Sequence, residues 1–217
     1  MEWSAENATK AFIRTLKLGN KAKEPDVAEF VSALAAGSGA RLMVEACADS
    51  AGPTTLALIA AAAQTGGRVT CVVPGPDELR SSLEALGAEA AGGVELVVGD
   101  AARLLQSEFR GADFVLVDGE LEERERVFRA AQAGAMESCG GGVVVGYNAL
   151  CESSWPSGNG GGGLRVDLLP IGGGLRVCRV PAAAAAKRSQ WVVRVDECTG
   201  EEHVFRIMSP RKKWIEA

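Results

Sequence analysis

The sequence predicts an α/β fold, a Rossmann-like, doubly wound, mostly parallel sheet with helices on both faces. Three observations predict it. Five short, valine-rich segments each alternate with a helical segment. These segments are apolar on both sides, which is typical of strands covered on both faces. Repeated strand–helix units of this length imply parallel strands joined by right-handed crossovers.

Composition sets the broad class. The chain has 217 residues, of which 47% are hydrophobic and 24% are charged, enough for one full-sized core. Its net charge of -5 argues against binding to nucleic acid. No apolar run reaches the ~18 residues of a membrane span, and the polar start is unlike a secretory signal. We expect a cytoplasmic protein; the short basic run 211–213 leaves a nuclear location open.

Two helices are expected before the sheet. The first begins after Ser4 and ends before Gly19. The second has Pro25 at its first position and ends at Gly37. The apolar stripe expected to be buried on the first helix consists of Ala8, Phe12, Ile13 and Leu16.

The alternation of strands and helices follows in order. The expected strands are residues 40–46, 68–73, 94–98, 113–118 and 141–147. The expected helices are residues 53–65, 77–88, 100–109 and 122–136. Pro53 favours a helix start, and Gly87 is expected to end the second of these helices.

The pattern changes after Tyr147. A glycine-rich loop comes first, and residues 164–180 then predict two antiparallel strands, so that the sheet closes on an antiparallel last strand. An alanine-rich linker precedes a β-hairpin extension with its turn at Thr199–Gly200. We therefore expect an α/β domain over residues 1–181. Residues 182–217 are expected to form a linker and hairpin, packed on or beside that domain.

Ligands of doubly wound sheets bind beyond the carboxyl ends of the strands, where the strand order reverses. Acidic and small side chains gather at these ends, among them Glu45, Gly52, Asp100 and Asp118. Each of them could instead terminate a strand or cap a helix, Asp100 in particular. The first strand–helix loop contains only Gly52, which argues against a pyrophosphate cradle and so against a nucleotide-dependent oxidoreductase.

The six cysteines show no CxxC pair and no metal-ligand spacing. Cys47, Cys71 and Cys178 lie in or beside strand-like runs, so we expect reduced, buried thiols.

Several phrases resemble known proteins, namely WSAENATKAFIRTLKL, EPDVAEFVSALAAG, QTGGR and VVGDAA. To about residue 180, the chain resembles a plant-specific family of uncharacterised class I S-adenosylmethionine-dependent methyltransferase-like proteins. More distantly, it is similar to the catechol and caffeoyl-CoA O-methyltransferase group. The resemblance implies that S-adenosylmethionine is the cofactor. Glu45, Gly52 and Thr54 match positions around its methionine portion. Asp100 matches a residue beside the adenine, and Asp118 matches the cofactor-binding aspartate after the fourth strand.

The chain also departs from that group. Asp118 and Asn148 match two metal ligands, but Tyr147 stands where a second metal aspartate is expected, so the metal site is degenerate and we expect no metal. Leu121 replaces the general-base lysine, and Pro74 replaces the acidic residue for the ribose hydroxyls.

Two functions remain open. One is an S-adenosylmethionine-binding, metal-independent methyltransferase for an unidentified small acceptor, with Trp155 as a candidate lid of the acceptor pocket. Such an enzyme can act by positioning its reactants. The alternative is a catalytically inactive binding or regulatory module, with a protein partner or a second copy at the C-terminal hairpin.

Overall fold

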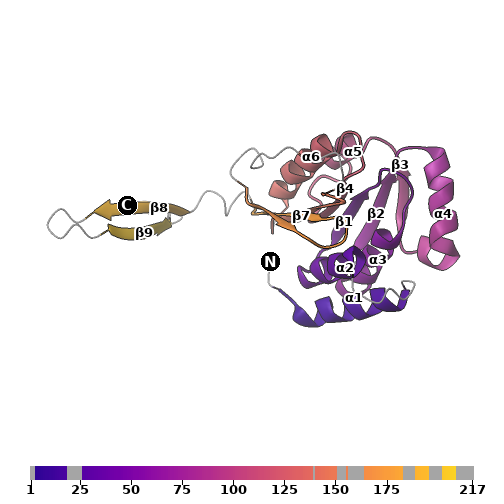
Figure 1. Ribbon diagram of the computed structural model, residues 1–217, viewed down its shortest axis with the longest axis horizontal. Coiled ribbons are helices and arrows are strands. Elements are labelled where there is room, and N and C mark those ends of the chain that lie inside the picture. Colours follow the sequence, from indigo (N-terminus) through magenta and orange to yellow (C-terminus); the bar gives the residue numbers. More distant parts are fainter. Residues whose placement is uncertain are drawn as a thin grey trace, which may run out of the picture.

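The computed structural model describes residues 3–18, 26–138, 140–150, 155, 164–182, 189–195 and 202–208. A seven-stranded sheet lies between two layers of helices, α1, α2 and α3 on one face and α5 and α6 on the other (Figure 1). Its strands are β1 (Leu42–Ala46), β2 (Arg68–Val73), β3 (Glu95–Val98), β4 (Phe114–Asp118), β5 (Gly142–Tyr147), β6 (Val166–Leu169) and β7 (Leu175–Val180). The helices are α1 (Ala5–Leu18), α2 (Val27–Gly37), α3 (Pro53–Thr65), α4 (Pro76–Ala91), α5 (Ala101–Gln106) and α6 (Arg124–Glu137).

The strand order is β3-β2-β1-β4-β5-β7-β6. The first five strands of the chain are parallel, and β7 runs antiparallel to both β5 and β6. The predicted Rossmann-like fold with an antiparallel strand at the end of the sheet is therefore confirmed. The order reverses between β1 and β4, which places the expected ligand crevice at the carboxyl ends of these two strands.

Side chains of the central strands alternate between two cores. Val44, Val115 and Val117 face α5 and α6, whereas Met43 and Leu116 face α1, α2 and α3. Both sets are almost fully buried, as expected for strands covered on both faces.

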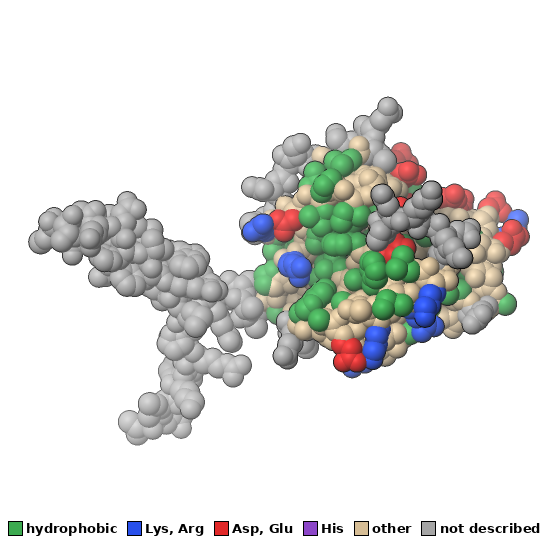
Figure 2. Space-filling model, turned by 60° about the horizontal axis from the view of Figure 1, so that its bottom comes forward, with side chains coloured by type: hydrophobic (Ala, Val, Ile, Leu, Met, Phe, Trp, Pro, Cys, Tyr) green, Lys and Arg blue, Asp and Glu red, His purple; other side chains and the backbone are tan. Residues whose placement is uncertain are grey.

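The buried face of α1 agrees with the predicted stripe at Ala8 and differs from it elsewhere. Its buried side chains are Ala8, Ala11 and Thr15, whereas Ile13 and Leu16 are 45% and 39% exposed. Small side chains allow α1 to lie close to α2 and α3, and this close packing outweighs the burial of the larger residues. Figure 2 brings this side of the molecule forward and shows hydrophobic side chains exposed on it.

Two helix ends refine the predictions. Asp26 and Glu29 form a capping box at the start of α2, in which Glu29 Oε2 accepts from the Asp26 amide at 2.9 Å. Pro25 lies outside the described residues. Gly87, expected to end α4, instead adopts φ 70° inside it, so the helix kinks there and continues to Ala91.

The C-terminal hairpin is confirmed as an antiparallel pair, β8 (Ser189–Val195) and β9 (Glu202–Met208), in a sheet of its own. The turn expected at Thr199–Gly200 lies outside the described residues. The boundary at residue 181 and the packing of the hairpin against the domain stay predictions. Within the described ranges, no helix has the length and apolarity needed to cross a membrane.

Candidate functional site

Asp118 connects the loops at the reversal of strand order. It ends β4 and is 8% exposed. Its Oδ2 accepts from the Ala48 amide, after β1, at 3.4 Å. Its Oδ1 accepts from the Glu120 amide at 3.0 Å and from Nδ2 of Asn148, after β5, at 3.2 Å. Asp118 and Asn148 therefore meet, and three strand ends share one carboxylate.

The backbone fits closely at the same place. Gly119 donates its amide to the Tyr147 carbonyl at 2.8 Å. A Cβ at Gly119 would lie 2.5 Å from that carbonyl oxygen, so this position requires glycine. Asn148 adopts φ 54°, a left-handed conformation that asparagine tolerates better than most residues. The end of β5 is thus held firmly against the end of β4.

Tyr147 takes the position where a metal aspartate was expected. Burial, together with the charges of Glu45, Cys47 and Asp118, raises the pKa of Tyr147. The phenol therefore stays protonated at neutral pH, and the structure does not favour Tyr147 as a general base.

Glu45 is fully buried in β1. Thr54 Oγ1 donates to its Oε1 at 2.5 Å, and Thr55 Oγ1 donates to its Oε2 at 2.6 Å. Burial raises the pKa of Glu45 to about 7. The hydrogen bonds from the two threonine hydroxyls lower this pKa, and the charge of Asp118 raises it further. Glu45 thus ties β1 to the start of α3, beneath the loop where the methionine portion of the cofactor was expected.

The loop between β1 and α3 is open to a ligand at Gly52. Gly52 caps α3 and donates its amide to Thr55 Oγ1 at 3.1 Å. The Ala51 amide donates to Ser82 Oγ at 2.8 Å, which attaches the loop to α4. A Cβ built on Gly52 would meet no atom within 4 Å. A ligand can therefore approach the loop at Gly52, as the S-adenosylmethionine prediction requires.

Asp100 lies further along the same edge, after β3. Its Oδ1 caps α5 by accepting from the amides of Ala102 and Arg103 at 3.0 and 3.2 Å, so the N-cap alternative is confirmed. Its Oδ2 pairs with Arg126 Nη2 at 2.7 Å, and this hydrogen bond is the main cause of the lowered pKa of Asp100. The cap also borders a hollow of about 500 Å³, whose lining residues are Gly99, Asp100, Arg103, Leu104, Gln106 and Ser107.

The further positions named from the sequence are Leu121, Pro74 and Trp155. Leu121 packs partly buried against the core below α6, and Pro74 is exposed at the end of β2. Trp155, expected as a lid, is instead 7% exposed and packs edge-on against Phe128, with ring centroids 5.1 Å apart. Arg176 stacks 5.0 Å from the centroids of both rings.

Sequence reasoning missed two contacts at and beside Glu45. Thr55 donates the second hydrogen bond to the Glu45 carboxylate. The thiol of Cys47, two residues after Glu45, contacts the thiol of Cys71, with Sγ atoms 3.2 Å apart. The signal for Cys47 is the two-residue spacing from Glu45, which places both side chains on one face of the strand. The contact with Cys71 depends on the register of β2, which periodicity does not fix.

Three solved structures that share this fold are methyltransferases. A caffeoyl-CoA O-methyltransferase-like protein from Staphylococcus aureus superposes with a TM-score of 0.56 at 11% identity, covering 82% of this chain and 93% of that one. The methyltransferase PaMTH1 of Podospora anserina, bound to S-adenosylhomocysteine, gives a TM-score of 0.54 at 15% identity, covering 82% and 89%. A methyltransferase from Geobacter sulfurreducens gives 0.54 at 17% identity, covering 82% and 90%. At these identities the likeness shows the fold alone, which this chain shares with those three methyltransferases.

A search of curated proteins found no match. A family profile described as "Protein of unknown function (DUF1442)" matches residues 1–207, nearly the whole chain. The protein therefore belongs to the DUF1442 family.

Proposed function

We propose that this protein binds S-adenosylmethionine in front of the β1–α3 loop and transfers its methyl group to a small acceptor without a metal ion at Asp118 and Asn148. The observation that carries the proposal is the junction made by Asp118, which holds three strand-end loops together beside the open side of Gly52. Crevices at such a reversal of strand order are where α/β sheets bind ligands.

The residues take different parts in this proposal. Gly52 faces the cofactor directly, because a Cβ at this position would meet no atom within 4 Å. Glu45 and Thr54 set the loop from beneath, because the Glu45 carboxylate is enclosed and accepts a hydroxyl at each oxygen. Asp118 fixes the loop at the Ala48 amide. Asp100 contacts the adenine end, at the hollow it borders.

Bound S-adenosylmethionine supplies an electrophilic methyl group. The chain contributes positioning, which alone can provide a large part of the rate. The residues described directly after strands β1 to β5 include no lysine or histidine, and Tyr147 stays protonated. We therefore expect an acceptor whose nucleophile is reactive without a protein base, such as an amine or an ionised thiol.

A non-catalytic binding module is the second candidate. It is favoured by the hydrogen bonds within the protein, because each oxygen of Glu45 and of Asp118 already accepts at least one donor of the protein itself. Ligand binding without turnover is the property that distinguishes this candidate from the enzyme.

The test is calorimetric titration with S-adenosylmethionine and S-adenosylhomocysteine, using two substitutions at one position. Gly52→Phe fills the open side, whereas Gly52→Ser is small and suits a helix N-cap. We expect micromolar binding to the wild type and Gly52→Ser, and its loss in Gly52→Phe with an unchanged unfolding temperature. Absence of binding at millimolar ligand contradicts the proposal. Binding without S-adenosylhomocysteine formation across a panel of amines and thiols favours the module.

A further inference from the structure

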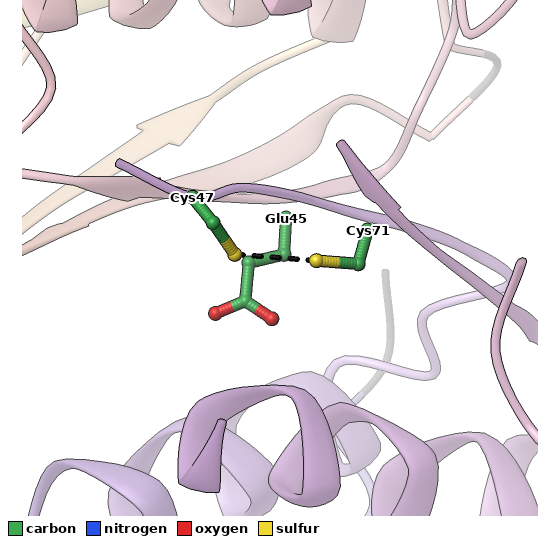
Figure 3. A group of neighbouring side chains, drawn as sticks. All are labelled: Glu45, Cys47 and Cys71. Atoms are coloured by element: carbon green, nitrogen blue, oxygen red, sulfur yellow. Dashed lines mark hydrogen bonds between the residues drawn. The ribbon is translucent and has the colours of Figure 1, made fainter. Parts of the chain in front are cut away.

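Beneath the β1–α3 loop lies a group of three ligand-bearing side chains. Glu45 and Cys71 face each other across β1 and β2, and Cys47 directly follows β1. Their carboxylate oxygen and sulfur atoms all lie within 4.8 Å of one another. The exposed fractions are 0%, 3% and 0% for Glu45, Cys47 and Cys71. Figure 3 shows the two thiols pointing toward each other, and the Glu45 carboxylate below the line that joins the two sulfur atoms.

The backbone holds the group in place. The Cys47 amide donates to the Val72 carbonyl at 3.0 Å, which extends the parallel ladder between β1 and β2 beyond the end of β1. The Glu45 carboxylate is oriented by Thr54 and Thr55, whose hydroxyls lie 2.5 and 2.6 Å from its two oxygens. A carboxylate held in this way by outer donors is typical of metal ligands, because the donors fix its orientation.

The charges that act on this group come from acidic neighbours. The charge of Asp118 raises the pKa values of both Glu45 and Cys47, and no lysine or arginine of the described residues lowers either one. Buried groups that can become anions are usually paired with a cation or bound to a metal.

We propose that Glu45, Cys47 and Cys71 bind a thiophilic divalent cation, with zinc as the reference ion, through two thiolates and one carboxylate oxygen. Thiolate ligands select zinc over magnesium or calcium, which prefer oxygen. Zinc–sulfur bonds of about 2.3 Å in a tetrahedron place the two sulfurs roughly 3.8 Å apart. The present separation of 3.2 Å therefore needs to increase by only about half an ångström.

Binding releases one proton from each thiol as the two metal–sulfur bonds form. It releases a third from Glu45 where that carboxyl group is protonated, and no oxidant is required. Three protein ligands leave one tetrahedral position for a water molecule. The ion would fasten the end of β1 to β2 beneath the loop, whereas the proposed cofactor lies in front of it. This site is thus separate from the pair Asp118 and Asn148, where no metal is expected.

The test isolates the two thiols in the full chain. In a background in which Cys139, Cys151, Cys178 and Cys198 are serine, the reduced, chelator-treated protein is titrated with Co²⁺ without oxygen. Thiolate-to-cobalt charge-transfer absorption should saturate at one equivalent, and Zn²⁺ should displace it. Cys47→Ala or Cys71→Ala should abolish the absorption. Glu45→Gln removes a direct ligand and should weaken binding by more than the roughly tenfold that the loss of an outer-shell partner costs. Cys178→Ser alone, which alters a thiol bonded to Gln132 Nε2 in the other core, should leave binding unchanged.

A second measurement, made on the wild-type protein, tests the proposal even if the cysteine variants do not fold. Cadmium NMR of the wild-type protein reports the donor set directly, and we expect the chemical shift of a site with two thiolates. The proposal is overturned if the folded wild type retains neither zinc nor cobalt after dialysis. It is also overturned if Cys47→Ala and Cys71→Ala retain the metal as well as wild type, or if the two thiols are found as a disulfide, two hydrogens lighter. Each assay omits S-adenosylmethionine, so its result does not depend on the proposed function.

Discussion

Thr54 donates a 2.5 Å hydrogen bond to Glu45, although the two residues lie on opposite sides of the β1–α3 loop. The loop is therefore closed from beneath by a side-chain bond as well as by its backbone. Because Glu45 is fully buried, the strength of this closure depends on the protonation of its carboxyl group.

The first prediction concerns pH. The pKa of Glu45 is raised by burial from 4.5 to about 7 in the folded protein, so the folded state holds more protons between these values. The contribution of Glu45 to the free energy of unfolding is then most favourable below about pH 4.5, falls as the pH rises to about 7, and is constant above. The total loss is about 3 kcal/mol.

Urea denaturation across this pH range, with a chelator present, measures the effect. The difference in unfolding free energy between wild type and Glu45→Gln should fall by that amount, because glutamine does not titrate. Asp77→Asn, at an exposed position of α4, should show no such difference. If the unfolding free energies of wild type and Glu45→Gln change with pH in parallel, the raised pKa of Glu45 is contradicted.

The second prediction separates the two threonines. Thr54→Val removes one donor to Glu45, and we expect a cost of about 1.5–3 kcal/mol at roughly pH 8, where the carboxylate is charged, and less at roughly pH 5. Thr55→Val should destabilise at both pH values, because Thr55 also accepts from the Gly52 amide. Both variants lose a donor to Glu45, so equal costs of the two at roughly pH 5 in the same urea experiment would contradict the additional role of Thr55.

The third prediction concerns the junction of β4 and β5. Gly119→Ala places a methyl group 2.5 Å from the Tyr147 carbonyl oxygen, and we expect about 1–3 kcal/mol of destabilisation from overpacking. Gly52→Ser is the matched control, because a side chain there enters open space. Thermal unfolding compares the two; a Gly119→Ala protein as stable as Gly52→Ser means that the two strand ends are not in close contact.

Much of the fold could be predicted because the strands are apolar on both sides, and few arrangements accommodate five such strands with intervening helices. The buried face of α1 could be predicted only in part. The predicted stripe correctly included Ala8, but the closeness of α2 and α3 buries Ala11 and Thr15 in place of Ile13 and Leu16. That selection depends on how near the neighbouring helices lie, which the sequence of α1 does not contain.

The candidate site shows the same division. The meeting of Asp118 and Asn148 follows from adjacent parallel strands that end at the same edge. The contact between Cys47 and Cys71 requires the register of β1 on β2, and a slip of one residue would turn one thiol to the opposite face. The pairing of Asp100 with Arg126 depends on the packing of α5 against α6 and so was also beyond the sequence.

The last prediction tests whether Asp100 is more than a helix cap. Asp100→Ser retains a capping oxygen but removes the carboxylate, whereas Asp100→Ala removes both. We expect Asp100→Ala to cost about 1 kcal/mol of stability and Asp100→Ser much less. If the carboxylate contacts the adenine end of the cofactor, both variants should bind S-adenosylmethionine roughly tenfold or more weakly than wild type, as for other hydrogen bonds to charged groups.

Arg126→Met provides the complementary variant. It leaves the cap in place and removes the ion pair, so the pKa of Asp100 should rise toward its ordinary value while stability changes little, because the guanidinium is exposed. With its Oδ2 no longer paired, the carboxylate becomes more available, and S-adenosylmethionine affinity should hold or increase. Unchanged affinity in Asp100→Ser, measured in the same calorimeter, would restrict Asp100 to capping α5 and move the adenine end of the proposed site away from this hollow.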